Sequence, residues 1–188
     1  MWDTSKQTTP AKKYQCGFCC TLVSSNECYS NTEKNGYTCS WIYICPECGQ
    51  PTYFYDHNKQ IPGIKPGKSI GKLPAYVSNL YDEIRNCHSV NAYNAVALLS
   101  RTLLSSCCVE LGADVGLKFI EYVEWLDEEN YIPKNSKHWV DKLRSIGNKQ
   151  AHELTATTVT ESNQLIEFIQ MLLTLIFEYA KDDENIQS

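Results

Sequence analysis

The sequence lacks a long uninterrupted apolar run, a low-complexity segment and an internal repeat. Its most apolar stretch, LIEFIQMLLTLIFEY, is interrupted by Glu167, Gln170 and Glu178, so it is too short to cross a lipid bilayer. The opening residues, MWDTSKQTTPAKKYQC, contain no apolar core of the kind that a secretion signal requires. These absences argue against a membrane partner and predict a soluble, cytoplasmic protein.

Acidic residues outnumber basic ones, 22 to 17, so the formal net charge is -5 at pH 7. This balance argues against a protein that coats nucleic acid indiscriminately. The charge is nevertheless uneven: residues 1–72 hold eight Lys and five Asp or Glu, a balance of +3, and the remainder holds nine Lys or Arg and seventeen Asp or Glu, a balance of -8. Any contact with nucleic acid is therefore expected to be local.

Cysteine, in contrast, is abundant, with ten residues in the chain. In a reducing compartment such cysteines indicate metal binding before disulfides. Two C-x2-C pairs, CGFC (Cys16, Cys19) and CPEC (Cys45, Cys48), have the spacing of turns that direct two sulfurs at one ion. They predict a structural Zn²⁺ site with four thiolate ligands. The first pair reads CGFCC, so Cys20 remains an alternative to Cys19 as the ligand.

Composition divides the chain into zones. Residues 14–56 are rich in Cys, Tyr and Thr and contain strand-like segments at 37–44 and 51–56. Residues 57–72 combine three glycines with two prolines, which is typical of a linker. We therefore predict an α+β protein, with a flexible N-terminal tail over 1–13, a zinc ribbon over 14–56, a linker over 57–72 and an all-α helical bundle over 73–188.

Periodicity and end signals predict helices in the last zone, near 74–88, 92–111, 115–129, 137–146 and 159–180. Thr158 and Glu161 are spaced as a capping box at the start of the last helix, and Gly112 and Gly147 are placed where helices end. The second helix is expected to bury a broad apolar face, formed by Ala95, Val96, Leu98, Leu99, Leu103 and Leu104. The cysteines without partner spacing, Cys87, Cys107 and Cys108, are expected to fill the core.

Two polar features stand apart from this pattern. Arg101 lies among apolar residues and needs an acidic, carbonyl or anionic partner unless it extends to solvent. Arg144, Asn148 and His152 fall near one face of a helix, where a guanidinium and a titratable imidazole together suit phosphodiester cleavage without a metal. The alternative for these three is a capped helix start with a solvated or core-bonded histidine.

A resemblance emerges from the order YQCGFC, IYICPECGQPT, LPAYVSNLYDEIR and GNKQAH. It is similar to the bacterial domain-of-unknown-function family numbered 4145, often found with an N-terminal zinc ribbon. This resemblance covers about residues 14–180 and implies a HEPN-like helical bundle. HEPN domains include metal-independent endoribonucleases in which an arginine and a histidine meet across a homodimer. Arg144 and His152 have seven residues between them, one more than that pattern has.

The resemblance implies a protein that acts on or binds nucleic acid, with RNA favoured over DNA, in a phage-defence or mobile-element context. The alternative is a non-catalytic ribbon and bundle that binds nucleic acid or a protein partner. The apolar last helix requires either a central place in the bundle or a second copy of the chain. We predict a homodimer.

Overall fold

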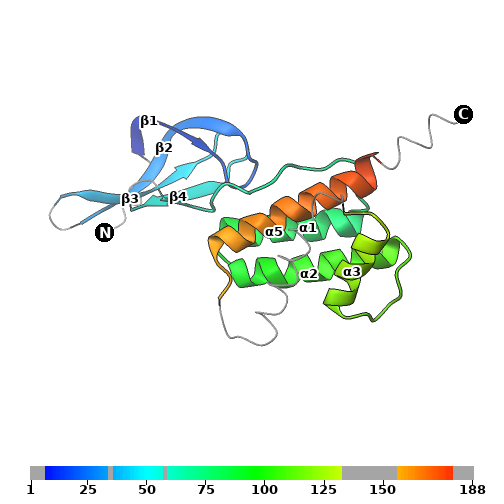
Figure 1. The fold of residues 1–188 in the computed structure, drawn as a ribbon. Helices are drawn as coiled ribbons and strands as arrows, with labels where there is room; N and C mark the ends of the chain where they lie inside the picture. The colour runs from blue at the N-terminus through cyan, green and yellow to red at the C-terminus, as the bar shows by residue number, and fades with distance from the viewer. Residues whose placement is uncertain (1–6, 34–35, 57–58, 133–155, 180–188) are drawn as a thin grey trace, which may run out of the picture. The chain divides into compact units, whose positions relative to one another are not determined.

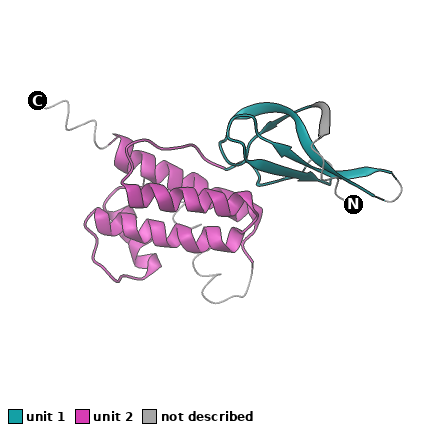
Figure 2. Ribbon diagram, turned by 180° about the vertical axis from the view of Figure 1, so that it is seen from behind, with its two compact units in different colours: residues 1–65 teal, residues 66–188 magenta. Residues whose placement is uncertain are grey.

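The computed structural model describes residues 7–33, 36–56, 59–132 and 156–179 (Figure 1). The chain divides into two compact units, Met1–Lys65 and Pro66–Ser188 (Figure 2). The division falls inside the segment 57–72 that composition marks as a linker. None of the helices among the described residues has the length and apolar character needed to cross a membrane. The chain is α+β, with a curled antiparallel sheet in the first unit and helices in the second.

The first unit is a five-stranded antiparallel sheet in which each strand pairs with the next along the chain. Its strands are β1 Gln7–Gln15, β2 Leu22–Thr32, β3 Thr38–Ile44, β4 Pro51–Tyr55 and β5 Lys59–Ile61. Strands β3 and β4 match the predicted segments 37–44 and 51–56.

Two strands lie partly or wholly outside the predicted ribbon, residues 14–56. Strand β1 begins at Gln7, inside the predicted tail 1–13, and strand β5 lies inside the predicted linker 57–72. Both are edge strands that owe their conformation to pairing with a neighbour, which composition does not reveal. In β1 the register shifts between Thr8 and Lys12, where Pro10 has no N–H to donate to the ladder.

The sheet encloses a small core of aromatic rings and cysteines. Tyr14 and Tyr43 each meet the ring of Phe54 edge to face, with centroid distances of 5.1 and 5.7 Å. Cys16 and Cys45 are buried in the same cluster. A unit of this size is only marginally stable on packing alone, so a crosslink through these cysteines is expected to matter for its fold.

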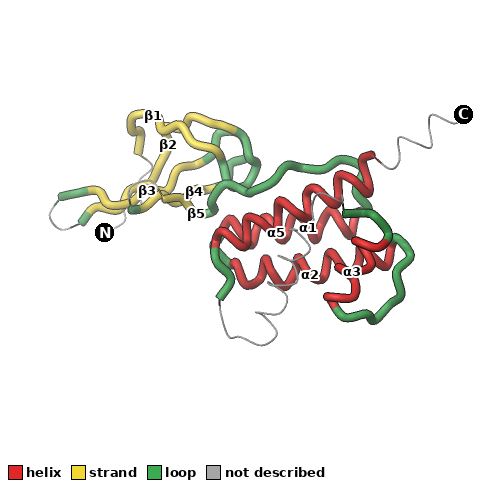
Figure 3. Tube along the Cα trace, in the orientation of Figure 1, coloured by secondary structure: helices red, strands yellow, loops and turns green. Residues whose placement is uncertain are grey.

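The second unit contains α1 Ala75–Ser89, α2 Tyr93–Glu110, α3 Phe119–Glu128 and α5 Val159–Leu173, which continues as the π-helix η2 Thr174–Tyr179 (Figure 3). These elements correspond to four of the predicted helices; the fifth, 137–146, lies outside the described residues. Helix α3 begins later than position 115 because Gly116 has φ +89° and Lys118 is extended. The Lys118 N–H donates to the Glu121 carboxylate there, which ends the loop.

Helix α5 is central in its unit. All eight of its large apolar residues that suggested a second copy are at most 6% exposed: Leu165, Ile166, Phe168, Ile169, Leu172, Leu173, Ile176 and Phe177. The predicted capping box is present, since the Glu161 N–H donates to the Thr158 hydroxyl and the Thr158 N–H to the Glu161 carboxylate. The chain covers this surface itself, so the apolar helix gives no reason to require a dimer.

Helix α2 buries most of the predicted face, since Val96, Leu103 and Leu104 are buried and Ala95 and Leu99 are half-buried. Leu98 is the exception, at 62% exposed, and the polar Ser100 is buried on this face. The buried positions follow the helical spacing of Val96, Ser100, Leu103 and Cys107, and Leu98 falls off that stripe. Cys107 and Cys108 are buried as predicted core residues.

Candidate metal centre

The two C-x2-C pairs form the same turn twice. One follows β1 and the other follows β3, so both turns leave the sheet at the end of a strand. In the first, the Cys16 N–H donates to Thr21 O at 3.0 Å, and in the second the Cys45 N–H donates to Gln50 O at the same distance. A further bond closes each turn onto the carbonyl of its first cysteine, at 2.9 Å in both cases.

This repetition decides between Cys19 and Cys20. The residue after the second cysteine of each pair is left-handed: Cys20 has φ 61° and Gly49 has φ 71°. Each of these residues supplies the N–H that closes its turn. Cys20 therefore occupies the place of a turn glycine, and Cys19 joins the four-sulfur cluster.

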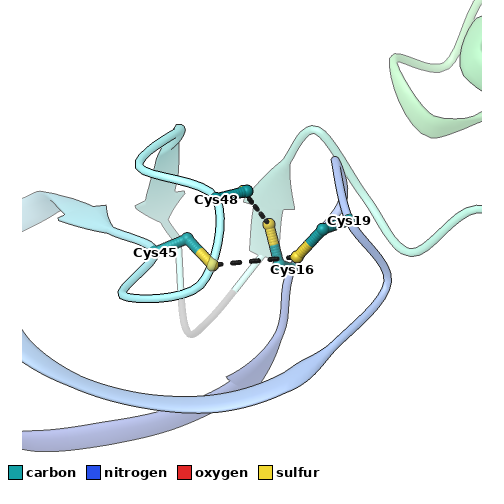
Figure 4. A group of neighbouring side chains, drawn as sticks. All are labelled: Cys16, Cys19, Cys45 and Cys48. Atoms are coloured by element: carbon teal, nitrogen blue, oxygen red, sulfur yellow. Dashed lines mark hydrogen bonds between the residues drawn. The ribbon is translucent and has the colours of Figure 1, made fainter.

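The sulfur atoms of Cys16, Cys19, Cys45 and Cys48 all lie within 4.8 Å of one another (Figure 4). The distances from Cys16 Sγ to Cys48 Sγ and from Cys19 Sγ to Cys45 Sγ are both 3.8 Å. This separation is far longer than a disulfide bond of about 2.05 Å. It equals the edge, about 3.8 Å, of a tetrahedron with metal–sulfur bonds of about 2.3 Å. The four cysteines thus fit a tetrahedral metal ion.

The surrounding groups give the four sulfurs unequal affinity for protons. The Thr21 hydroxyl lowers the pKa of Cys19 to about 6 by hydrogen bonding. Burial raises the pKa of Cys48 to about 12 and also raises the pKa of Cys16. The Phe18 N–H points at Cys16 Sγ, 3.4 Å away, and favours its thiolate form. Because a metal ion binds thiolates, it must displace protons from Cys16 and Cys48 at neutral pH.

We therefore expect the affinity of the cluster for a metal to fall as the pH falls. Below the pKa of each ligand a proton competes with the ion, so release of at least two protons lowers the association constant by at least about 100-fold for each unit that the pH falls. Competition between the protein and a chromophoric chelator for Zn²⁺, from about pH 6 to about pH 8, measures this slope. A slope of about tenfold per unit or less would contradict proton displacement from both thiols.

A comparison with protein-family models finds one match, over residues 82–188, to the family described as Domain of unknown function (DUF4145). The match spans more than half of the chain. The chain belongs to the DUF4145 family. No curated protein and no solved structure matches. The DUF4145 region starts within α1, so the sheet unit and all four clustered cysteines precede it.

Of the polar residues singled out as candidate site residues in the DUF4145 region, the structure describes Arg101 alone. Arg101 is partly exposed on α2, and its guanidinium lies 4.9 Å from the ring centroid of Phe119. This cation–π contact accounts for an arginine beside the core without an anionic ligand. Arg144, Asn148 and His152 lie outside the described residues.

The structure assigns a role to an arginine that the sequence analysis overlooked. Arg85 of α1 is only 5% exposed and donates from Nε to Pro66 O at 2.8 Å and from Nη2 to Gly67 O at 3.2 Å. It also pairs with Asp82 at 3.1 Å. A usable signal was present in LYDEIR, since Arg85 shares the helical stripe of Tyr81 and Ile84. A charged group on a buried stripe needs partners, and here they are backbone carbonyls.

Proposed function

We propose that this DUF4145 protein binds single-stranded nucleic acid, with RNA favoured, and that a structural Zn²⁺ ion holds the sheet unit in its binding form. The four cysteine ligands support a structural role for the metal. Four cysteine ligands complete a tetrahedral shell and leave no position for substrate or water. The ion would stabilise the sheet and take no part in chemistry.

The outer face of the sheet is the observation that carries the proposal. Tyr29, Ile42, Tyr53 and Ile61 are paired in register across β2, β3, β4 and β5, so they form one row on the same face. All four side chains are half-buried. The Tyr55 ring lies parallel to the Tyr53 ring, with centroids 5.4 Å apart and planes 10° apart. Flat, partly exposed aromatic rings on a sheet are a surface on which unpaired bases stack.

The distribution of charge also favours the sheet unit as the part of the chain that binds nucleic acid. Residues 1–72 carry a balance of +3, and the remainder carries -8. A polyanion is therefore attracted to the first part of the chain and repelled by the rest. The modest size of the positive balance predicts weak binding that relies on stacking more than on phosphate contacts.

Replacement of Tyr53 by alanine is expected to weaken binding of a fluorescein-labelled single-stranded RNA about tenfold. The reason is the loss of one stacking surface, which contributes about 1–3 kcal/mol per base. Fluorescence anisotropy of the zinc-loaded protein measures the change.

Tyr76→Ala is the matched control for Tyr53→Ala, because Tyr76 is an exposed tyrosine on α1, in the other unit of the chain. It should leave the affinity unchanged. Equal losses in both variants, or no binding by the unmodified protein at about 100 µM, would contradict the proposal, since weak non-specific binding already falls within that range. Binding of duplex as tightly as single strands would argue against stacking.

The helical unit suggests a second candidate function, metal-independent RNA cleavage by a HEPN-like homodimer. The chemistry of Arg144, Asn148 and His152 favours it, because an imidazole can transfer protons and a guanidinium can stabilise developing charge on phosphate. His152→Ala is expected to lower RNA cleavage by at least about 100-fold with no change in zinc content. Cleavage of labelled RNA in the presence of EDTA measures this. Retained cleavage in the variant, or none in the parent protein, favours a non-catalytic binding module, and light scattering tests the dimer.

A further inference from the structure

The chain that leaves the sheet unit is attached to the first cysteine turn. Gly17 lies inside that turn, and a Cβ placed on it would lie 2.5 Å from Pro62 O and 2.6 Å from Gly63 O. Only a glycine allows the backbone at 62–63 to approach so closely. Gln60 strengthens this attachment, since its side-chain N–H groups donate to Gln15 O at 3.0 Å and to Pro62 O at 3.1 Å.

The same chain is attached again as it enters the helical unit. Arg85 binds the carbonyls of Pro66 and Gly67, and the Tyr81 hydroxyl donates to Lys68 O at 3.2 Å. The other side of the segment is held by the last helix. The Lys68 N–H donates to the Gln170 side-chain oxygen at 2.8 Å, and the Gly71 N–H donates to the Glu178 carboxylate at 2.9 Å.

Only Ile64 and Lys65 separate the two attached stretches. Ile64 is 52% exposed, which fits a short joint between units. The first attachment depends on the cysteine turn around Gly17, and that turn is crosslinked to the second turn through the four sulfurs. A metal ion would therefore fix the surface against which Pro62 and Gly63 pack.

We infer that the metal centre restricts the joint between the two units: with the ion bound and the turn intact, movement is confined to Ile64–Lys65. This inference rests on the metal site of the proposed function and adds a mechanical role to it. Release of Pro62 and Gly63 from the turn adds two residues to the joint. Two residues extend its reach by up to about 7 Å. The metal would then govern how freely the sheet unit moves relative to the DUF4145 region.

Gly17→Ala tests the joint without removing a ligand. The new methyl group collides with two backbone carbonyls, so Pro62 and Gly63 must leave the turn. We expect zinc-loaded Gly17→Ala to keep one ion per chain, by mass spectrometry of metals, and to show a broader distribution of interatomic distances in small-angle X-ray scattering. Gly71→Ala is the matched control: its Cβ would meet only Glu178 Oε1, at an ordinary 3.6 Å, and its scattering should equal that of the parent.

A second variant covers the case in which Gly17→Ala distorts the cysteine turn and weakens metal binding. Gln60→Ala removes the bonds to Gln15 O and Pro62 O and leaves both cysteine turns untouched. If Gly17→Ala binds less than one ion, broadening in Gln60→Ala supports the inference and its absence overturns it. If the metal-loaded variants scatter like the parent protein, the inference about the joint is wrong and the proposed metal centre is unaffected. A parent protein that binds no zinc overturns the proposed metal centre and the joint with it. RNA binding is not a readout, so its absence leaves this result unaffected.

Discussion

Removal of the metal with a strong chelator is expected to unfold the sheet unit and leave the helical unit folded. Cys16 and Cys45 are at once members of the metal cluster and of the small buried core, so loss of the ion opens the core itself. Structural zinc in small domains contributes about 10–16 kcal/mol of apparent folding free energy near neutral pH. Few apolar contacts remain in this unit to replace that contribution.

Cys45→Ser provides the genetic equivalent of chelation. We expect it to abolish stable zinc binding and to collapse amide protection across β1–β5 in hydrogen-exchange mass spectrometry, while α1, α2 and α5 stay protected. Cys39→Ser is the matched control, because Cys39 is exposed in the same unit and outside the cluster. Protection of the sheet in metal-free Cys45→Ser would show that packing alone maintains the unit. Loss of protection in the helices would show that the two units do not fold separately.

Arg85→Ala is expected to lower the free energy of unfolding of the helical unit by about 2–4 kcal/mol. The substitution removes donors to Pro66 O and Gly67 O, leaves two carbonyls without partners and empties space beside Tyr81, whose ring lies 5.5 Å from the guanidinium. Arg85→Lys should recover only part of the loss, because an ammonium group cannot reproduce the planar fork. Urea denaturation followed by circular dichroism at 222 nm measures the change.

Arg101→Ala is the control for the arginine prediction. Arg101 also lies on a helix of the same unit and also contacts an aromatic ring, but it is partly exposed. A partly exposed cation–π contact contributes about 0.5–1 kcal/mol. Equal destabilisation by the two substitutions would show that the carbonyl bonds of Arg85 add nothing to stability.

These expectations rest on features that differ in how far local sequence determines them. The C-x2-C spacing predicted the four-cysteine cluster because the geometry of each turn is set within six residues. The capping box at Thr158 was predictable for the same reason. Helix positions followed from periodicity, which reports the burial of one face without regard to what covers it.

Other features depended on partners remote in the chain. Strand β5 pairs with β4 inside a segment that composition presented as a linker, and Leu98 lies exposed on a helix whose apolar residues seemed to form one face. The apolar surface of α5, which allowed either a central helix or a dimer, is covered within the chain. Periodicity cannot distinguish these cases because it contains no information on the covering element.

The sequence by itself determined the DUF4145 membership, the paired cysteine turns and most helix positions, since each is encoded by residue identities at short spacing. Only the tertiary structure decided that Cys20 serves as a turn residue and that Arg85 holds the chain at Pro66 and Gly67. The role of Cys20 follows from its left-handed backbone inside a local turn, which residue identity alone does not reveal. The role of Arg85 follows from carbonyls 19 and 18 residues earlier in the chain, which come within its reach only when the chain folds.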